Sequence, residues 1–223
     1  MLTRIAVLVS GGGTNLHALL DAQARGEIRS GRIELVIADR PEAYALKRAA
    51  AAGVRTAVVH KKECAGRAQF EALLLQRLEE ARIELVVLAG FLQILSAEFV
   101  RRYPSRIINV HPSLIPSFCG DGFYGLKVHE EVLRRGVKVT GATVHFVDEG
   151  TDTGPIILQQ AVCVEQDDTP ETLQKRVMEQ AEWVIFPKAV ALFAAGRLKI
   201  EDGRVRILEE ESIDEDLSRW KRR

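Results

Sequence analysis

The sequence predicts an α/β fold, a doubly wound and mostly parallel sheet with helices on both faces. In the first half of the chain, short apolar runs alternate with helical segments, which is the rhythm of strands joined by helical crossovers. These runs are continuously apolar, as is typical of parallel strands that helices cover on both faces. Two later strands flank a turn-rich loop, so antiparallel pairing is expected toward the C-terminal part.

The first element is expected to be a strand, Arg4–Val9, which ends at three consecutive glycines. Leu16, Leu19 and Leu20 then recur at helical spacing, so the glycines form a tight loop between a strand and a helix. The same alternation continues to the middle of the chain. The elements expected there are a strand at Arg32–Ala38, a helix at Ala43–Ala52, a strand at Val54–Val59, a helix at Arg67–Arg82 and a strand at Glu84–Ala89.

The second half begins with a short helix, Ala97–Tyr103, and a strand, Arg106–Val110, that runs directly into His111. A glycine-rich loop, Ser113–Gly125, follows, and its length marks it as functional or mobile. The remaining expected elements are a helix at Lys127–Arg135, strands at Val137–Val147 and Ile156–Val164, a long helix from Pro170 to Ala195 with a kink or break near Phe186 because of Pro187, and a partly ordered surface tail at Glu209–Arg223.

Composition excludes several classes of protein. The 223 residues, 47% hydrophobic and 28% charged, fit one globular domain over residues 1–223. The 31 Lys and Arg residues balance 31 Asp and Glu residues, so no net charge attracts nucleic acid or an anionic membrane. No apolar stretch approaches the roughly 20 residues needed to cross a bilayer. No signal-peptide pattern opens the chain, so we expect a cytoplasmic location.

Cysteine and histidine spacing gives no sign of a metal or disulfide site. Cys64, Cys119 and Cys163 are far apart and form no Cys-x-x-Cys pair, so reduced thiols are expected. The five histidines lack the i, i+4 spacing of a helical metal site. We therefore expect no bound metal.

The glycine loop between Ser10 and Asn15 is a candidate anion site. Glycines allow close approach of a ligand to the backbone, and free N–H groups at a helix start favour a phosphate. Leu16 stands where a dinucleotide-binding fingerprint has its third glycine, which favours a phosphate monoester. Asp39, near the end of the second strand, keeps a ribose-binding role in a nicotinamide enzyme open.

Asn109 and His111 lie two residues apart at the carboxyl end of a predicted central strand, so they point to the same side. An amide N–H and an imidazolium side by side can hold a developing oxyanion. The alternative is that both simply hydrogen-bond the strand end. Ser113 is a further option as a nucleophile, although it lacks the Gly-x-Ser-x-Gly elbow and can equally organise its turn.

An acidic loop, Asp148–Pro155, follows the predicted strand that contains His145. Asp152 would favour and orient an imidazolium if this loop folds over His111. His145, within an apolar strand, is expected to be a hydrogen-bonded core histidine. Glu182, on the long last helix, would ordinarily be a surface charge.

Several stretches together resemble the phosphoribosylglycinamide formyltransferases of purine synthesis. They are Ser10–Leu16, Val86–Leu95, Ile108–Pro116 and Gly141–Leu158, and the order of elements agrees as far as Leu198. The most specific part is the Asn-Val-His-Pro-Ser-Leu-Ile-Pro segment with the downstream Asp152. This resemblance implies a Rossmann-like fold, in agreement with the pattern of strands and helices.

The resemblance also implies roles for particular residues. Asn109, His111 and Asp152 would be the catalytic trio. The substrate phosphate would be held by Gly13, Thr14 and Asn15, and the glycinamide end by Glu182. The folate pterin pocket would be lined by Leu92, Gln93, Ile94 and Leu95, with Asn109 beside it and Arg67 facing the folate glutamate tail. Family members commonly have Arg where this chain has Gln93, and the loop at Phe118–Val128 is extended here.

By the same resemblance, the reactants would be 10-formyltetrahydrofolate, as co-substrate, and glycinamide ribonucleotide, and a homodimer is compatible with the sequence. Methionyl-tRNA formyltransferase and formyltetrahydrofolate deformylase share the trio but carry an added domain, and we expect neither here. A nicotinamide-binding oxidoreductase is the alternative from another class. No nucleic acid or membrane partner is expected.

Overall fold

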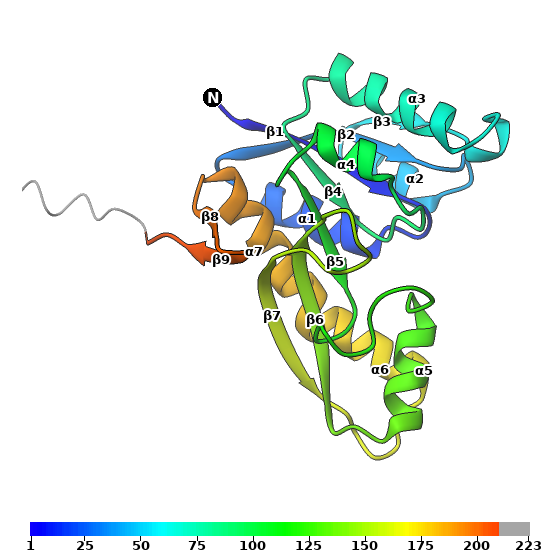
Figure 1. Cartoon of the computed structure of the whole chain (residues 1–223), viewed down its shortest axis with the longest axis vertical. Helices are drawn as coiled ribbons and strands as arrows, with labels where there is room; N and C mark the ends of the chain where they lie inside the picture. The colour runs from blue at the N-terminus through cyan, green and yellow to red at the C-terminus, as the bar shows by residue number, and fades with distance from the viewer. Residues whose placement is uncertain (210–223) are drawn as a thin grey trace, which may run out of the picture.

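A mixed sheet of seven strands forms the centre of the computed structural model, which describes residues 1–209 (Figure 1). The strand order is β3-β2-β1-β4-β5-β6-β7. The strands run over Thr3–Val9 (β1), Gly31–Ala38 (β2), Arg55–Val58 (β3), Leu85–Leu88 (β4), Ile107–His111 (β5), Val139–Phe146 (β6) and Ile156–Cys163 (β7).

Strand β5 separates two kinds of pairing. The first five strands pair in parallel, as the rhythm of strands and helices predicts, whereas β6 is antiparallel to both β5 and β7. The predicted fold class is therefore confirmed. Strand order reverses between β1 and β4, and ligands in open α/β sheets bind at such a crevice, beyond the carboxyl ends of the strands.

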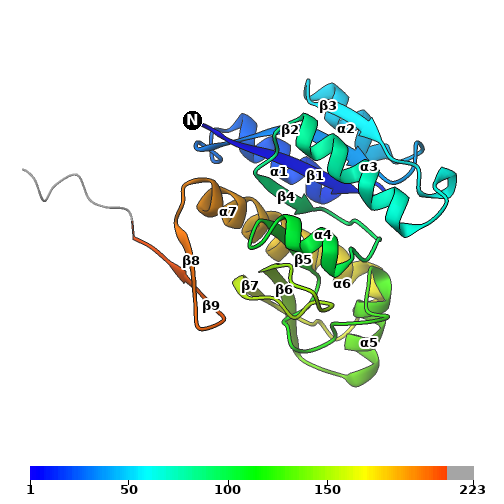
Figure 2. The ribbon, with the colours of Figure 1, turned by 45° about the horizontal axis from the view of Figure 1, so that its top comes forward.

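Helices cover both faces of the sheet (Figure 2). For the four α-helices between residues 44 and 135 the sequence predicts both ends to within two residues. The bounds of the helices are Thr14–Ala24 (α1), Tyr44–Ala51 (α2), Arg67–Glu80 (α3), Ala97–Arg102 (α4), Leu126–Arg135 (α5), Pro170–Val177 (α6) and Trp183–Ala194 (α7), with a 3-10 turn at Lys61–Glu63.

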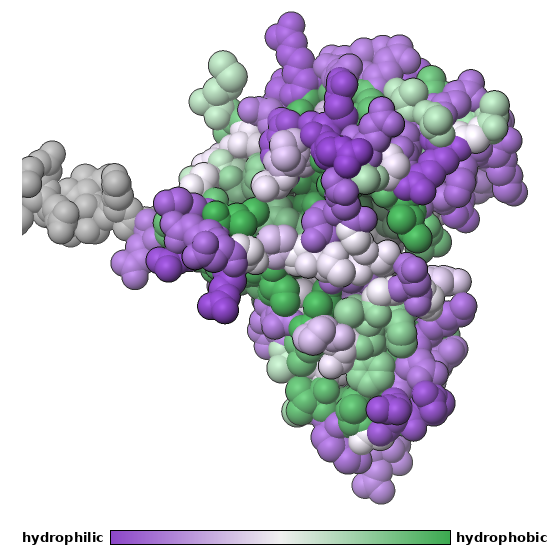
Figure 3. Space-filling view, viewed as in Figure 1, coloured by the Kyte–Doolittle hydropathy of each residue, from purple (hydrophilic) through white to green (hydrophobic). Residues whose placement is uncertain are grey.

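Two buried clusters show how the helices share the sheet. Alternate residues of β1 point to opposite faces, so Val7 packs with α1 and α7, whereas Leu8 packs with α3 and α4. Phe186 of α7 is fully buried in the first cluster, and Phe70 of α3 is nearly so in the second. Both faces of the parallel strands are thus dry, which explains their continuous apolar sequences. On the outside, hydrophilic side chains cover the upper helices in the view of Figure 3.

The long last helix differs from its prediction. The expected kink or break near Phe186 is not where the helix becomes irregular, and Pro187 lies inside α7. Instead a π-helical turn, Met178–Glu182, joins α6 to α7. Pro187 leaves the carbonyl of Trp183 without its helical N–H partner, and this carbonyl lies after the π turn, so the irregularity comes earlier in the chain than the proline predicts.

A small hairpin follows the last helix, which the sequence analysis missed. Strands β8 (Leu198–Glu201) and β9 (Arg204–Ile207) pair antiparallel. Asp202 and Gly203 join them with φ of 50° and 72°, as a two-residue hairpin turn requires. The signal, Asp-Gly between apolar-alternating residues, was therefore present in the sequence. Almost all of the predicted tail, residues 210–223, lies outside the described residues.

Within residues 1–209, no helix is long and apolar enough to cross a membrane.

Candidate active site

A cleft of about 630 Å³ lies at the carboxyl ends of β4 and β5. Nine residues that the sequence predicts for the site line it together. Gly13, Thr14 and Arg67 do not line it. The nine are Asn15, Leu92, Gln93, Ile94, Leu95, Asn109, His111, Asp152 and Glu182.

His111 and Asp152 meet in the middle of this cleft. Nδ1 of His111 lies 3.4 Å from Oδ2 of Asp152, and both side chains are largely buried. The acidic loop thus folds over the end of β5. This was the condition for Asp152 to favour and orient the imidazolium of His111. The backbone N–H of Gly120 donates to the same carboxylate over 3.0 Å. Asp152 has φ of 58°, a left-handed conformation that short polar side chains tolerate.

His145 also belongs to this cluster, which the sequence analysis did not foresee. It is buried and hydrogen-bonded, as predicted, but its partners are site residues. Its Nε2 lies 3.6 Å from Oδ1 of Asp152 and 3.2 Å from Nδ2 of Asn109. Antiparallel pairing places Asn109 opposite His145, and a bulge in the β6–β7 pairing falls between Val144 and His145. The antiparallel pairing expected in this part of the chain was the feature of the sequence that could have placed His145 near Asn109.

The surroundings of His111 and Asp152 shift the pKa values of both groups. Burial raises the pKa of Asp152, but the hydrogen bond from His145, the charge of His111 and the N–H of Gly120 outweigh it, so the pKa lies below its ordinary value. The pKa of His111 lies below its ordinary value, because burial lowers it and the Asp152 carboxylate and the Phe118 carbonyl oppose this only in part. Asp152 is therefore the fixed negative charge of the cluster.

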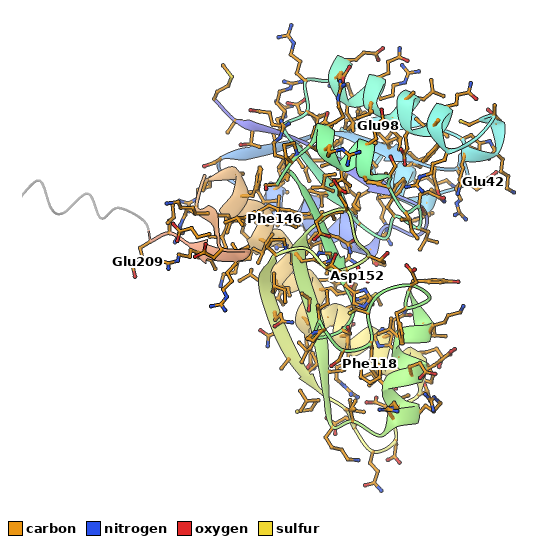
Figure 4. All side chains as sticks on the ribbon, viewed as in Figure 1. Glu42, Glu98, Phe118, Phe146, Asp152 and Glu209 are labelled. Carbon is orange, nitrogen blue, oxygen red and sulfur yellow. The ribbon has the colours of Figure 1, made fainter. Side chains whose placement is uncertain are left out.

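The extended loop reaches His111 directly. The carbonyl of Phe118 lies 2.8 Å from Nε2 of His111. Both ring nitrogens of His111 thus face oxygens that only accept hydrogen bonds, which favours the protonated ring and opposes the effect of burial. Figure 4 shows Asp152 near the middle of the molecule, with Phe118 below it in the loop before α5.

Neither nearby nucleophile is prepared for attack. Ser113 is fully buried, and its hydroxyl donates to the carbonyl of Ser117 over 2.6 Å, so it organises the turn. Burial and the Asp152 carboxylate raise the pKa of the Cys119 thiol. A raised pKa keeps this thiol protonated and a poor nucleophile.

The glycines of this loop have two different roles. Gly13 is the N-cap of α1 with φ of 70°, and a Cβ there would meet Cβ of Ala45 at 2.6 Å. Its lack of a side chain therefore serves the packing of α2. A Cβ at Gly11 or Gly12 would meet nothing within 4 Å, so these two residues leave the loop open to a ligand. Thr14 is the first helical residue rather than a cap.

Arg48 brings a cation to this loop, which the sequence analysis missed. Its Nε donates to the carbonyl of Gly12 over 2.9 Å. The sequence shows only an alanine-rich helix at this position. The packing of α2 on the loop is needed to show that Arg48 is the residue that reaches the glycines. The first-turn N–H groups of α1 have no intrahelical acceptor and point to the same region.

Glu182 is buried, contrary to its expected place as a surface charge. The π turn carries it into the cleft, where Nδ2 of Asn15 donates to its Oε2 over 2.6 Å. Burial raises the pKa of Glu182 to about 7, and the bond from Asn15 opposes this only in part. Oδ1 of Asn15 is buried without a hydrogen-bond partner. This corner therefore holds a free acceptor beside a carboxyl group that titrates near neutrality.

The segment after β4 forms the apolar side of the cleft. Leu92 and Ile94 are 55% and 67% exposed, high values for side chains in a cleft. Gln93 donates to the buried carboxylate of Asp39 over 2.6 Å and accepts from Nζ of Lys61. Asp39 also pairs with Arg40 at 3.1 Å, so its carboxylate is already engaged. This argues against the ribose-binding role that a nicotinamide enzyme would need.

Arg67 begins α3 and pairs with Glu71 at 3.0 Å. The predicted position of Arg67 opposite the folate tail thus stays a prediction. Within residues 1–209 no group of three or more His, Cys, Asp and Glu residues is placed to hold a metal.

Comparison with known proteins identifies the class. Residues 3–190 match the family described as "Formyl transferase". The chain therefore belongs to the formyl transferase family.

Within this family the chain belongs with the phosphoribosylglycinamide formyltransferases. It is 36% identical to the enzyme of that name from Haemophilus influenzae, over 89% of this chain and 91% of that protein. Glycinamide ribonucleotide transformylase 1 from Symbiobacterium toebii superposes with a TM-score of 0.87 and 46% identity, over 93% of this chain and 95% of that one. The chain is also 44% identical to the human trifunctional purine biosynthetic protein adenosine-3, over 93% of its own length but 20% of that protein.

Proposed function

We propose that this chain transfers the formyl group of 10-formyltetrahydrofolate to the primary amine of glycinamide ribonucleotide, in purine biosynthesis. The observation that carries the proposal is the contact of His111 with Asp152 in the middle of the cleft. The exposed apolar side chains of Leu92 and Ile94 line the same cleft as the polar Asn15 and Glu182. The cleft thus offers both apolar and polar contacts to two different reactants.

In the proposed reaction the amine nitrogen attacks the formyl carbon, and a tetrahedral intermediate with an oxyanion forms. The Asn109 amide and the protonated His111 donate to that oxyanion, whose charge develops only after attack. The bond between the carbon and folate N10 then breaks, and N10 takes up a proton. Asp152 holds His111 and relays the proton lost by the amine through a water molecule.

This role requires a change at the Phe118 carbonyl, because it engages Nε2 of His111. We propose that the formyl oxygen takes the place of this carbonyl when both substrates bind. The loop then acts as a removable cap on His111. The exchange replaces one hydrogen-bond acceptor by another, so the imidazolium stays satisfied throughout.

Transfer is proposed to be direct, without a formyl-enzyme. The engaged hydroxyl of Ser113 and the raised pKa of Cys119 support this. Exposure of the protein to 10-formyltetrahydrofolate alone, followed by mass spectrometry, should show the unmodified mass. A formyl adduct on either side chain would contradict direct transfer.

The substrate ends are assigned by chemistry. The ribonucleotide phosphate would sit on the loop Gly11–Asn15 with Arg48 nearby, and Glu182 would bind the glycinamide end. The pterin would pack on Leu92–Leu95, with Arg67 toward the glutamate tail. We further propose one domain, a cytoplasmic location and small-molecule reactants without nucleic acid or membrane; the sequence is also compatible with a homodimer.

The decisive experiment mixes the protein with both reactants and follows tetrahydrofolate. Release is expected only when glycinamide ribonucleotide is present, with formation of the formylated ribonucleotide. Release of formate from the folate without the ribonucleotide would identify a deformylase instead and overturn the proposal.

A further inference from the structure

A second hollow, of about 360 Å³, lies at the opposite edge of the sheet from the cleft. Two of its residues, Ile83 and Arg106, come just before β4 and β5, whereas the cleft lies beyond the other ends of the same strands. The hollow is within the size range of small-ligand sites. Its lining consists of Glu79, Arg82, Ile83, Arg102, Tyr103 and Arg106.

Charge in this hollow is unusually one-sided for a chain without net charge. Three guanidinium groups face one carboxylate, which leaves 3 − 1 = 2 positive charges. Glu79 pairs with Arg102 at 2.6 Å. Arg106 stacks over the ring of buried Tyr103 at 5.0 Å and donates to the carbonyl of Arg102 over 3.0 Å. Two of the three guanidinium groups therefore have partners within the protein at the hollow.

The third cation, Arg82, occupies a position that normally belongs to glycine. α1, α2 and α7 all end with the same pair of backbone hydrogen bonds, and each places a glycine at the left-handed residue: Gly26, Gly53 and Gly196, with φ from 68° to 74°. α3 ends with the same pair of bonds but places Arg82 there, at φ of 51°.

A left-handed conformation is less favourable for a residue with a side chain than for glycine. Strain of this kind points to a function for the side chain. Within residues 1–209, the exposed side chain of Arg82 makes no hydrogen bond or ion pair, so its guanidinium is free to meet a ligand.

We propose that this hollow is a binding site for a small phosphorylated molecule that carries a di- or triphosphate group. Guanidinium groups match phosphate oxygens with paired hydrogen bonds, and two unbalanced positive charges suit a multiply charged anion. The buried Tyr103 and Ile83 leave little open apolar surface, so the phosphates rather than a base provide the contacts. The site is separate from the cleft and independent of the formyl transfer proposed above.

The test follows backbone amide shifts by NMR during titration of the full chain with inorganic pyrophosphate. Saturable shifts are expected at Arg82, Ile83 and Arg106. Arg82→Gly should weaken this binding about tenfold, the effect of one lost charged contact. The variant should melt at the same or a higher temperature, because glycine relieves the left-handed strain.

Two controls keep the result interpretable. The amides of Gly12 and Thr14 report any binding at the glycine loop, and their response should be equal in wild type and Arg82→Gly. Arg135→Gln, which removes an exposed arginine of α5 outside the hollow, should leave the shifts unchanged. Shifts that fail to saturate through the millimolar range indicate an adventitious ion only. That result, or equal affinity in Arg82→Gly, would overturn the proposal.

Discussion

The two buried carboxyl groups of the cleft have opposite surroundings. Asp152 lies between His111 and His145 and accepts from the N–H of Gly120, and its pKa lies below the ordinary value. Glu182 has one neutral partner, the Asn15 amide, and its pKa is raised to about 7. Both groups are buried, so burial alone does not decide the charge of a carboxyl group. The number and charge of its hydrogen-bond donors decide it.

Because of this difference, the two carboxyl groups suit different roles in the cleft. A permanently ionised Asp152 can hold an imidazolium in place, which a neutral acid cannot. A carboxyl group with a pKa near 7 can accept or release a proton as a charged substrate group arrives. The contrast between Asp152 and Glu182 can be tested by substitution, beginning with the largest expected effect.

Removing either member of the His111–Asp152 pair should lower activity the most. We expect His111→Ala and Asp152→Asn each to lower kcat by on the order of a hundredfold or more, the effect of one lost oxyanion donor. Steady-state kinetics with both substrates measures this. Glu130→Gln, an exposed carboxylate on α5, is the matched control and should retain full kcat.

The double variant of His111 and Asp152 sharpens this prediction. Residues that act as one unit lose their joint effect once, so its kcat should lie far above the product of the two single effects. Independent multiplication of the two losses, or normal turnover of Asp152→Asn, would leave Asp152 as a loop residue only.

Neutralising Glu182 should change how stability depends on pH. The folded pKa of Glu182 is about 7 against 4.5 for the free group. Between these values the folded state holds the proton and the unfolded state loses it, so stability falls as pH rises from 4.5 to 7. Glu182→Gln cannot lose that proton. At pH 8 it should be more stable than wild type by on the order of 3 kcal/mol, and near pH 4 by almost nothing.

Urea unfolding at both pH values measures this difference. Because other groups titrate equally in the two proteins, only the gap between them is diagnostic. A gap that stays constant with pH would mean that Glu182 is ionised throughout, and the contrast with Asp152 would fail.

His145 should contribute a smaller share. We expect His145→Gln to lower kcat about tenfold, because the amide keeps a donor toward Asp152 but places it less well than the ring. The ribonucleotide KM should hardly change, because the contacts of His145 are with Asp152 and Asn109 rather than with the glycine loop. A change in KM with unaltered kcat would remove His145 from the support of Asp152.

The glycine loop offers the smallest and most local test. Gly12→Val should raise the ribonucleotide KM about tenfold, with little effect on the folate Kd or on the melting temperature, because no described atom lies within 4 Å of a Cβ there. Gly13→Val is the contrasting variant. It should lower the melting temperature, because its side chain would collide with Ala45.

Much of this architecture could be predicted from local patterns. The strands and helices up to Phe146 followed from apolar period and breakers, and the sequence placed Asn109 and His111 correctly on one strand end. The contact of Asp152 with His111 could only be stated conditionally, since nothing local fixes how a loop folds over a distant strand. Glu182 was expected outside because its burial depends on a π turn, which the helical spacing of apolar residues does not predict.

The bulge between Val144 and His145 has a consequence for how this fold tolerates change in length. His145 takes its alignment from β5, where it lies opposite Asn109, and the bulge releases it from the alignment of β7. A shift of one residue in the alignment of β7 can therefore be absorbed at the bulge without turning His145 to the other side of the sheet. The side of the sheet to which His145 points is thus set by β5 and not by the outer strand.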